Sequence, residues 1–149
     1  MNRAEADLIA RRTIARYAAA IDHKDFDAVA AIFSEDSELR RVGIVTEGRD
    51  AIARFYSEHL PTVGQMRHHM TNILAEPEGN LIVAQCLFSY VQVLDEGVRF
   101  GWGNYDDVIR PTTDSDGVFV EKEITVHHSQ VFPLTDVNPD MLPGGIQGI

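Results

Sequence analysis

The sequence has little cysteine: a single residue, Cys86, among 149. One cysteine excludes an internal disulfide bond and a zinc site built from several cysteines. Cys86 stands in the middle of the apolar stretch VAQCLFSY, where a small buried hydrophobic residue is the ordinary role of such a side chain. We therefore do not expect Cys86 to act as a nucleophile.

Long apolar runs and positive charge are also scarce. No segment approaches the roughly 18 consecutive apolar residues that a membrane-spanning helix requires, and the polar start, MNRAEAD, lacks the apolar block of a signal peptide. Thirteen basic residues against 23 acidic ones give a net charge of -10, which would repel a nucleic acid backbone. We expect a cytoplasmic protein that binds neither membranes nor nucleic acids.

Motifs of several common enzyme classes are missing as well. The sequence contains no GxSxG, no glycine-rich phosphate loop and no GxGxxG after a strand. Two pairs of adjacent histidines occur, His68 with His69 and His127 with His128. Neighbours on a strand point to opposite faces of the sheet, so at most one histidine of each pair could reach a shared metal ion. We expect no cofactor and no bound metal.

The first part of the chain has helical periodicity. Apolar residues recur at intervals of three and four at Ile14, Tyr17, Ala18 and Ile21. This spacing predicts a helix over residues 4–21. Asp25 is a suitable N-cap for a second, short helix, which the sequence SEDSE should end.

A third helix and a series of strands follow. Gly48 precedes a third apolar stripe, which Pro61 should end. Turn-rich sequences such as EPEGN and PTTDSDG separate segments with the composition of strands. The predicted strands cover residues 38–46, 66–75, 81–94, 98–110 and 118–132.

This order of elements predicts an α+β fold. Three N-terminal helices should pack on one face of a strongly curved, mostly antiparallel sheet, giving a cone-shaped barrel. We predict one domain over residues 1–149, with an irregular tail at 133–149, where three prolines and three glycines occur. The interior of such a cone is the natural place for a small apolar ligand.

Strand alternation indicates which histidines enter this interior. Between residues 66 and 74, His68 shares a face with Met66, Met70, Asn72 and Leu74, and this face is more apolar than the one that carries His69. We therefore expect His68 to point inward, although a bulge of one residue would exchange His68 and His69. On the last strand the same reasoning places His128 inward. A buried histidine held by one hydrogen bond is the simpler alternative for both.

Two residues of the first helix are further candidates. Asp22 follows the apolar stripe at the C-terminal end of the helix, where the helix dipole disfavours a carboxylate, so another group should hold it there. Tyr17 lies within the stripe, and a buried tyrosine needs a partner for its hydroxyl group. A solvated acid and a core tyrosine are the simpler alternatives.

Four segments together resemble a known family. YAAAIDHKDFDAVAAIFSEDSELR, GRDAIARFY, RHHMTN and GNYDDVIR occur in this order and resemble the SnoaL-like branch of the nuclear-transport-factor-2-like (cystatin-like) superfamily. This branch includes scytalone dehydratase, bile-acid 7α-dehydratase, hexachlorocyclohexane dehydrochlorinase and polyketide cyclases. The resemblance covers residues 5–132 and implies the cone-shaped α+β fold.

The resemblance also implies roles for individual residues. The family aspartate falls on Asp22 and the histidine of the H-x-x-T-N motif on His68, which implies a dyad in which the carboxylate orients the imidazole as general base. The position five residues before the aspartate is Tyr17. A second family histidine has no counterpart near Val91–Val93, and the region of Lys122–His128 stands where the family often has an arginine.

These observations together predict a cofactor-independent lyase of the dehydratase type. His68 would remove a proton from carbon, Asp22 would orient it, and Tyr17 would donate a hydrogen bond to developing negative charge. The candidate walls of the pocket for a small apolar or aromatic substrate are Phe55, Met70, Phe88 and Trp102. An isomerase or a cyclase could use the same residues, and a non-catalytic ligand-binding or association subunit is the alternative outside catalysis. A broad outer sheet face favours a homo-oligomer, either a dimer or a trimer.

Overall fold

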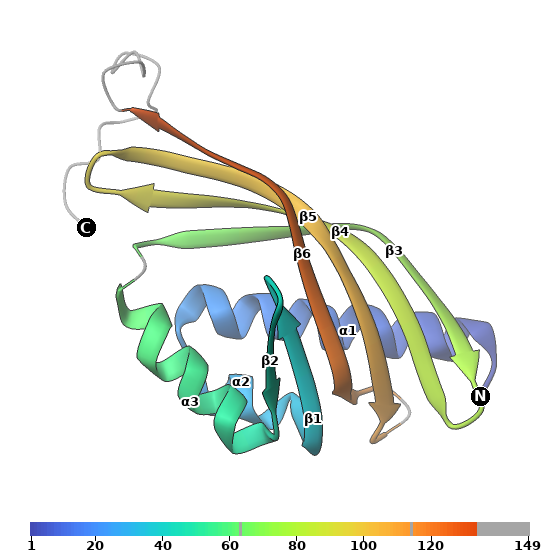
Figure 1. Ribbon diagram of the computed structural model, residues 1–149. Coiled ribbons are helices and arrows are strands. Elements are labelled where there is room, and N and C mark those ends of the chain that lie inside the picture. Colours follow the sequence, from blue (N-terminus) through green and yellow to red (C-terminus); the bar gives the residue numbers. More distant parts are fainter. Residues whose placement is uncertain (63, 114, 134–149) are drawn as a thin grey trace.

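The computed structural model describes residues 1–62, 64–113 and 115–133. Three helices gather on one side of a long, curved sheet (Figure 1). They are α1 (Arg3–His23), α2 (Phe26–Ala31) and α3 (Arg49–His59), the last continued by the short 3-10 helix η1 (Leu60–Thr62). No helix in the described ranges is long and apolar enough to cross a membrane. The predicted tail at 133–149 lies outside the described residues except for Pro133.

The first helix begins and ends with clear local signals. The side chain of Asn2 accepts a hydrogen bond from the Glu5 amide at 3.0 Å, and the Glu5 carboxylate accepts one from the Asn2 amide at 2.9 Å. This reciprocal capping fixes the start of α1. At the other end Lys24 takes a left-handed conformation (φ 56°), and its amide reaches the carbonyls of Ala20 and Ile21. Asp22 therefore lies in the last turn of α1.

The six strands form one sheet in the order β2-β1-β6-β5-β4-β3. Their bounds are β1 Phe33–Arg41, β2 Ile44–Glu47, β3 Met66–Glu78, β4 Leu81–Leu94, β5 Gly97–Pro111 and β6 Gly117–Pro133. All neighbours are antiparallel except β1 and β6, which are parallel. The predicted α+β class is confirmed. The predicted closure into a cone-shaped barrel is wrong: the sheet is curved but open, with β2 and β3 as its edges.

One predicted strand, residues 38–46, is a hairpin in the structure. β1 already begins at Phe33, and the turn between β1 and β2 lies at Val42 (φ 51°) and Gly43 (φ 75°). Two successive residues with positive φ are typical of a tight two-residue hairpin turn. The charged stretch SEDSE, which we expected to end the second helix, belongs to β1, where Glu35 and Asp36 remain exposed.

The hydrophobic core lies between the helices and the concave face of the sheet. α1 packs mainly against β3, whereas α3 packs against α2 and β1. Buried side chains from all three helices and from β1, β3, β4, β5 and β6 form one cluster. The helices do not fill the concave face completely, and a cavity remains beside α3.

Candidate active site

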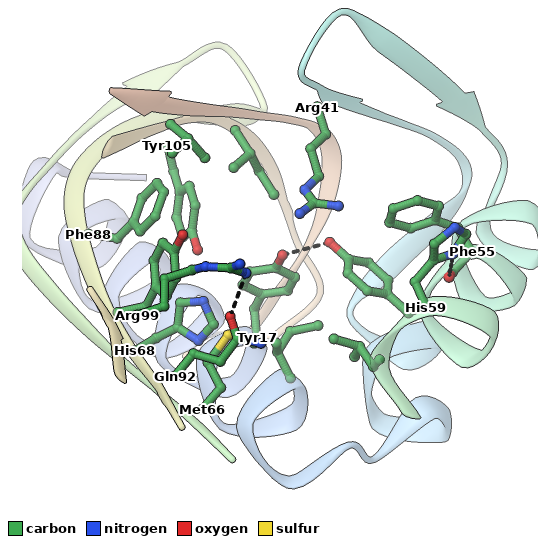
Figure 2. Close-up of a pocket in the computed structure, with 16 residues that line it drawn as sticks. Tyr17, Arg41, Phe55, His59, Met66, His68, Phe88, Gln92, Arg99 and Tyr105 are labelled. Carbon is green, nitrogen blue, oxygen red and sulfur yellow. Dashed lines mark hydrogen bonds between the residues drawn. The ribbon is translucent and has the colours of Figure 1, made fainter. Parts of the chain in front are cut away.

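A cavity of about 190 Å³ lies between the helices and the concave face of the sheet. Its wall mixes apolar and aromatic side chains with imidazole, hydroxyl and guanidinium groups, which come from α1, α3, β1, β3, β4, β5 and β6. Figure 2 shows these side chains converging on one space. A small, partly apolar molecule that needs a few polar contacts fits such a site.

Asp22 and His68, which the sequence predicted as partners, lie in contact. His68 Nδ1 is 2.6 Å from Asp22 Oδ1, and the backbone amide of His68 donates a hydrogen bond to Asp22 Oδ2 at 2.9 Å. Both carboxylate oxygens are therefore used by a single residue. Both side chains are well shielded, with 10% of His68 and 9% of Asp22 exposed. These two donors explain how a carboxylate is held at the unfavourable end of the α1 dipole.

This contact determines which imidazole nitrogen can act as a base. Asp22 Oδ1 accepts the bond, so Nδ1 of His68 carries the proton and Nε2 of the neutral ring keeps its lone pair. No residue in the described part of the chain hydrogen bonds to Nε2. His68 lines the cavity, and the rings of Tyr90 and Phe88 lie 5.9 Å and 6.4 Å from its ring.

Tyr17 shares a hydrogen bond with a second tyrosine that the sequence reasoning did not select. The hydroxyl groups of Tyr17 and Tyr56 lie 2.6 Å apart, and both residues line the cavity. Burial raises the pKa of Tyr17 well above its usual value. Burial also raises the pKa of Tyr56 to about 12, against smaller lowering effects of the Tyr17 bond and the Arg41 charge. Both hydroxyls therefore stay protonated at neutral pH, and only one of the two protons is used in their mutual bond.

Two glycines of β5 create room for the aromatic wall of the cavity. A Cβ atom at Gly101 would lie 2.6 Å from the Tyr90 ring, and one at Gly103 would lie 2.9 Å from the Phe88 ring. The alternation FGWGNY therefore lets the rings of β4 lie directly on the β5 backbone. Phe88 and Tyr90 then reach the cavity, and the Tyr90 hydroxyl meets Ser129 Oγ at 2.9 Å.

The four predicted wall residues have different positions. Phe55 and Phe88 line the cavity, and Phe55 stacks on His59 with ring centroids 4.5 Å apart. Met70 shares the face of His68 but packs against the hydrophobic core instead. The prediction for Trp102 is wrong: its side chain is 44% exposed on the outer face of the sheet.

The prediction that His128 points inward is also wrong. The register between β5 and β6 shifts so that Trp102 pairs with His128 and Gly103 with Val126, which leaves His127 as an extra residue. This bulge reverses the alternation, and His128 is exposed and stacks on Trp102 at 4.4 Å between ring centroids. Neither His128 nor Trp102 lines the cavity.

A second bulge, on β3, lies beyond the histidine pair. The register between β3 and β4 shifts between Thr71 and Leu74, and Asn72 has a positive φ of 52°. Asn72 and Leu74, which we expected inside, are consequently exposed. His68 precedes the shift and keeps its alternation, while His69 is exposed on the opposite face.

The outer face of the sheet carries many exposed apolar side chains. They are Leu74, Val83, Leu87, Val93, Phe100, Trp102 and Phe132. An exposed apolar surface of this kind is typical of a protein interface. It supports the predicted homo-oligomer, which stays a prediction.

Sequence reasoning missed two arginines of the cavity, Arg41 and Arg99. Figure 2 shows both side chains pointing into the cavity, and Arg99 Nη1 donates to Gln92 Oε1 at 3.1 Å. Arg99 shares the inward face of β5 with Gly101, Gly103 and Tyr105, so alternation along this strand could have found it. Arg41 ends β1 next to the hairpin turn, where no alternation could be recognised.

Metal ligands do not cluster in the described ranges: no group of three or more His, Cys, Asp or Glu side chains there could hold a metal ion. The polar groups of the cavity are instead suited to proton transfer and hydrogen bonding. Asp22 and His68 provide an oriented base, and Tyr17 and Tyr56 provide a protonated donor.

Comparison with solved structures finds the same fold in several proteins. A protein provisionally named a scytalone dehydratase, from Novosphingobium aromaticivorans, has a TM-score of 0.72 at 20% identity, over 82% of this chain and 84% of that one. A type 2 hexachlorocyclohexane dehydrochlorinase has a TM-score of 0.75 at 17% identity, over 92% and 93% of the two chains. At such identities the likeness concerns the fold.

A search of curated proteins found no match. The family model described as the SnoaL-like domain, however, matches residues 2–120. This match covers most of the chain, including both α1 with Asp22 and the strand with His68. The resemblance inferred from the four sequence segments is thereby confirmed: the chain belongs to the SnoaL-like domain family.

Proposed function

We propose that this protein is a cofactor-independent lyase of the dehydratase type, which acts on a small organic molecule by removing a proton from carbon. The observation that carries the proposal is the 2.6 Å contact between His68 Nδ1 and Asp22 Oδ1 at the edge of a partly apolar cavity. An imidazole held in one tautomer by a shielded carboxylate is a general base in many enzymes. Fold relatives that include a dehydrochlorinase agree with this reaction class.

His68 Nε2 takes the proton in the first step. The electron pair of the broken C–H bond forms the new carbon–carbon double bond, and the leaving group departs with the electrons of its own bond. Asp22 stabilises the imidazolium that results, as a carboxylate does in other oriented pairs. The proton on Nε2 then passes to solvent or to the leaving group, which leaves as water where it is a hydroxyl group.

The hydroxyl pair supplies the second function. In the bond between Tyr17 and Tyr56 one hydroxyl donates and the other accepts, so the acceptor still has a proton to offer to the cavity. A fixed donor of this kind, shielded from water, stabilises negative charge on an enolate oxygen or on a departing oxygen. Its partner keeps it oriented without taking its proton.

The experiment is a substrate screen followed by three variants. Wild-type protein is mixed with hydroxy-ketones, steroid-like enones and chlorinated rings, and formation of a conjugated double bond is followed by ultraviolet absorbance. For a converted substrate we expect His68→Ala and Asp22→Asn to lower kcat by about 10²- to 10⁴-fold, the usual contribution of an oriented base.

His69→Ala is the matched control for these variants. It removes the neighbouring histidine, which is exposed on the opposite face of the same strand, and should keep wild-type kcat. Circular dichroism and thermal unfolding verify that each variant is folded. Unchanged turnover in folded His68→Ala or Asp22→Asn would refute the proposed base, and failure to convert any substrate would favour a binding role.

A further inference from the structure

The charge of the cavity is opposite to the charge of the protein. The chain carries 23 acidic and 13 basic residues. The described residues that line the cavity nevertheless include two arginines, Arg41 and Arg99, and neither an aspartate nor a glutamate. A neutral apolar substrate offers no charge to balance two guanidinium groups in this place. Two positive charges in one cavity point to a negatively charged partner group.

Neither guanidinium has an acidic partner within the described part of the chain. Arg99 bonds only to the side-chain oxygen of Gln92, and Arg41 lies over the Phe55 ring at 5.7 Å from its centroid. Six other arginines, in contrast, pair with carboxylates: Arg3, Arg11, Arg12, Arg16, Arg40 and Arg110. Arg49, Arg54 and Arg67 also have no carboxylate partner among the described residues, so Arg41 and Arg99 are distinguished by lining the same cavity.

The two arginines are placed differently. Gln92 is the direct cross-strand neighbour of Arg99 and is only 6% exposed, so its oxygen fixes the orientation of a partly buried guanidinium. One contact leaves the other donors of the planar fork of Arg99 to face the cavity. Arg41 is exposed and comes from the end of β1, and Figure 2 shows it entering the cavity from another side than Arg99.

We propose that the substrate carries a carboxylate group, which the guanidinium of Arg99 binds while Arg41 attracts it at the entrance. The substrate class is then a small alicyclic or aromatic carboxylic acid, with its ring against Phe88, Met66 and Ile21. A planar guanidinium matches a carboxylate with two parallel hydrogen bonds. Only Arg99 is partly withdrawn from water, so a single negative charge, rather than a doubly charged phosphate, balances the interior of the site.

This inference rests on the proposed lyase function for its meaning but not for its test. The carboxylate would anchor one end of the substrate and thereby select the C–H bond that meets His68 Nε2. Anchoring by a remote group of the substrate is a general means of orienting the reacting atoms. The anchor can be measured by binding alone, without turnover.

The test compares acids with their uncharged amides by isothermal titration calorimetry. Cyclohexanecarboxylate and benzoate are titrated into wild-type protein beside cyclohexanecarboxamide and benzamide, which have the same shape without the charge. We expect each acid to bind at least about tenfold more tightly than its amide, as a charge-assisted hydrogen bond predicts. This comparison needs no variant, so it stays valid even if a substitution at Arg99 impairs folding.

Three variants then locate the charge that is responsible. Arg99→Gln should reduce the preference for the acid to within about twofold, and Arg41→Gln should lower acid affinity by about threefold, as an exposed charge does. Arg67→Gln is the matched control, because it removes an exposed arginine on the strand that carries His68 but outside the cavity lining. It should bind the acids like the wild type.

Several results would overturn the proposal. They are equal affinities for acid and amide, an equal loss in Arg67→Gln and Arg99→Gln, and phenyl phosphate binding about tenfold more tightly than benzoate. The same titrations on Asp22→Asn, the variant expected to lose turnover, show whether the acid preference is independent of the proposed base. Acid preference without any turnover would leave the carboxylate site in place and refute only the lyase, whereas turnover of neutral substrates with no acid preference would do the reverse.

Discussion

Two carboxylates in this molecule each hold a basic side chain, but in different surroundings. Asp22 holds His68 beside the cavity, where both side chains keep about a tenth of their surface exposed. Asp107 holds Lys122 at 3.0 Å and 3.2 Å in the core, where neither side chain is exposed at all. The first pair keeps one imidazole nitrogen for a ligand, whereas the second directs its charges to each other and to the surrounding rings.

Aromatic rings surround the inner pair. Lys122 Nζ lies 3.6 Å from the ring centroid of Tyr105, 4.4 Å from that of Tyr17 and 4.5 Å from that of Phe119. The rings of Tyr17 and Tyr105 also form part of the cavity wall, so they stand between the buried ammonium group and the ligand space. Access to the cavity, rather than the presence of an acid–base pair, therefore distinguishes a candidate catalytic group from a structural one.

The largest expected effect comes from breaking the inner pair. Lys122→Met would leave Asp107 buried without its partner, and an unpaired charge in the core costs about 3–5 kcal/mol of stability. The free energy of unfolding, measured by urea titration, should fall by this amount. Lys24→Met serves as the control, since it replaces a lysine that lies outside the core. A loss below about 1 kcal/mol for Lys122→Met would contradict the structural role of this pair.

The inner pair should also make stability depend on pH. Burial is the main cause that raises the pKa of Asp107 from 3.8 to about 6. Between these two values the unfolded carboxyl group loses its proton before the folded one does, so stability falls as the pH rises. The loss is complete about one pH unit above the folded pKa and amounts to about 3 kcal/mol by linkage. Burial is also the main cause that lowers the pKa of Lys122.

The measurement compares urea unfolding of the wild type with that of the double variant Asp107→Leu/Lys122→Met from about pH 4.5 to about pH 7.5. All other titrating groups are common to both proteins, so the difference isolates the pair. The stability of the wild type relative to the double variant should decrease with rising pH. A flat or increasing difference would show that Asp107 does not titrate in this range.

The two pairs also differ in how well the sequence predicted them. Asp22 and His68 could be found because each belongs to a regular local pattern, the end of an amphipathic helix and an alternating strand, and because the family motif pointed to the same residues. Asp107 and Lys122 are direct neighbours on β5 and β6, but that register depends on a shift between Val108 and Ile109. Sequence alone gave no sign of this shift, so neither residue was recognised as a buried charge.

The errors elsewhere have the same physical origin. Helices and strands were predicted well because their periodicity is local, whereas the bulge at His127 reversed the inward prediction for His128 and the bulge on β3 did so for Leu74. The hairpin turn at Val42 and Gly43 was missed because it has only one glycine to indicate it. Arg41 and Arg99 line one cavity although they lie on β1 and β5, which β6 separates in the sheet.

A smaller effect on stability is expected from the outer pair. Asp22→Asn keeps an oxygen that can accept the bond from the His68 amide but loses the charge that holds Nδ1. We expect a loss of about 1 kcal/mol in the free energy of unfolding, the net value of one hydrogen bond, together with the large loss of kcat proposed above. Urea unfolding and turnover on the same preparation test this separation. A loss of stability as large as that of Lys122→Met would make Asp22 a structural residue instead.

The smallest effect should come from removing the inner pair as a whole. In Asp107→Leu/Lys122→Met both charges are replaced by apolar side chains of similar volume, so no unpaired charge remains and the desolvation cost of the pair is gone. Such replacements are neutral or stabilising in other proteins, and we expect the stability at neutral pH to stay within about 1 kcal/mol of the wild type. Because the rings of Tyr17 and Tyr105 remain between this site and the cavity, kcat for a converted substrate should change less than about threefold. A folded double variant that lost turnover as severely as His68→Ala would instead make the inner pair part of the catalytic machinery, acting on the hydroxyl group of Tyr17 through the charge of Lys122 above its ring.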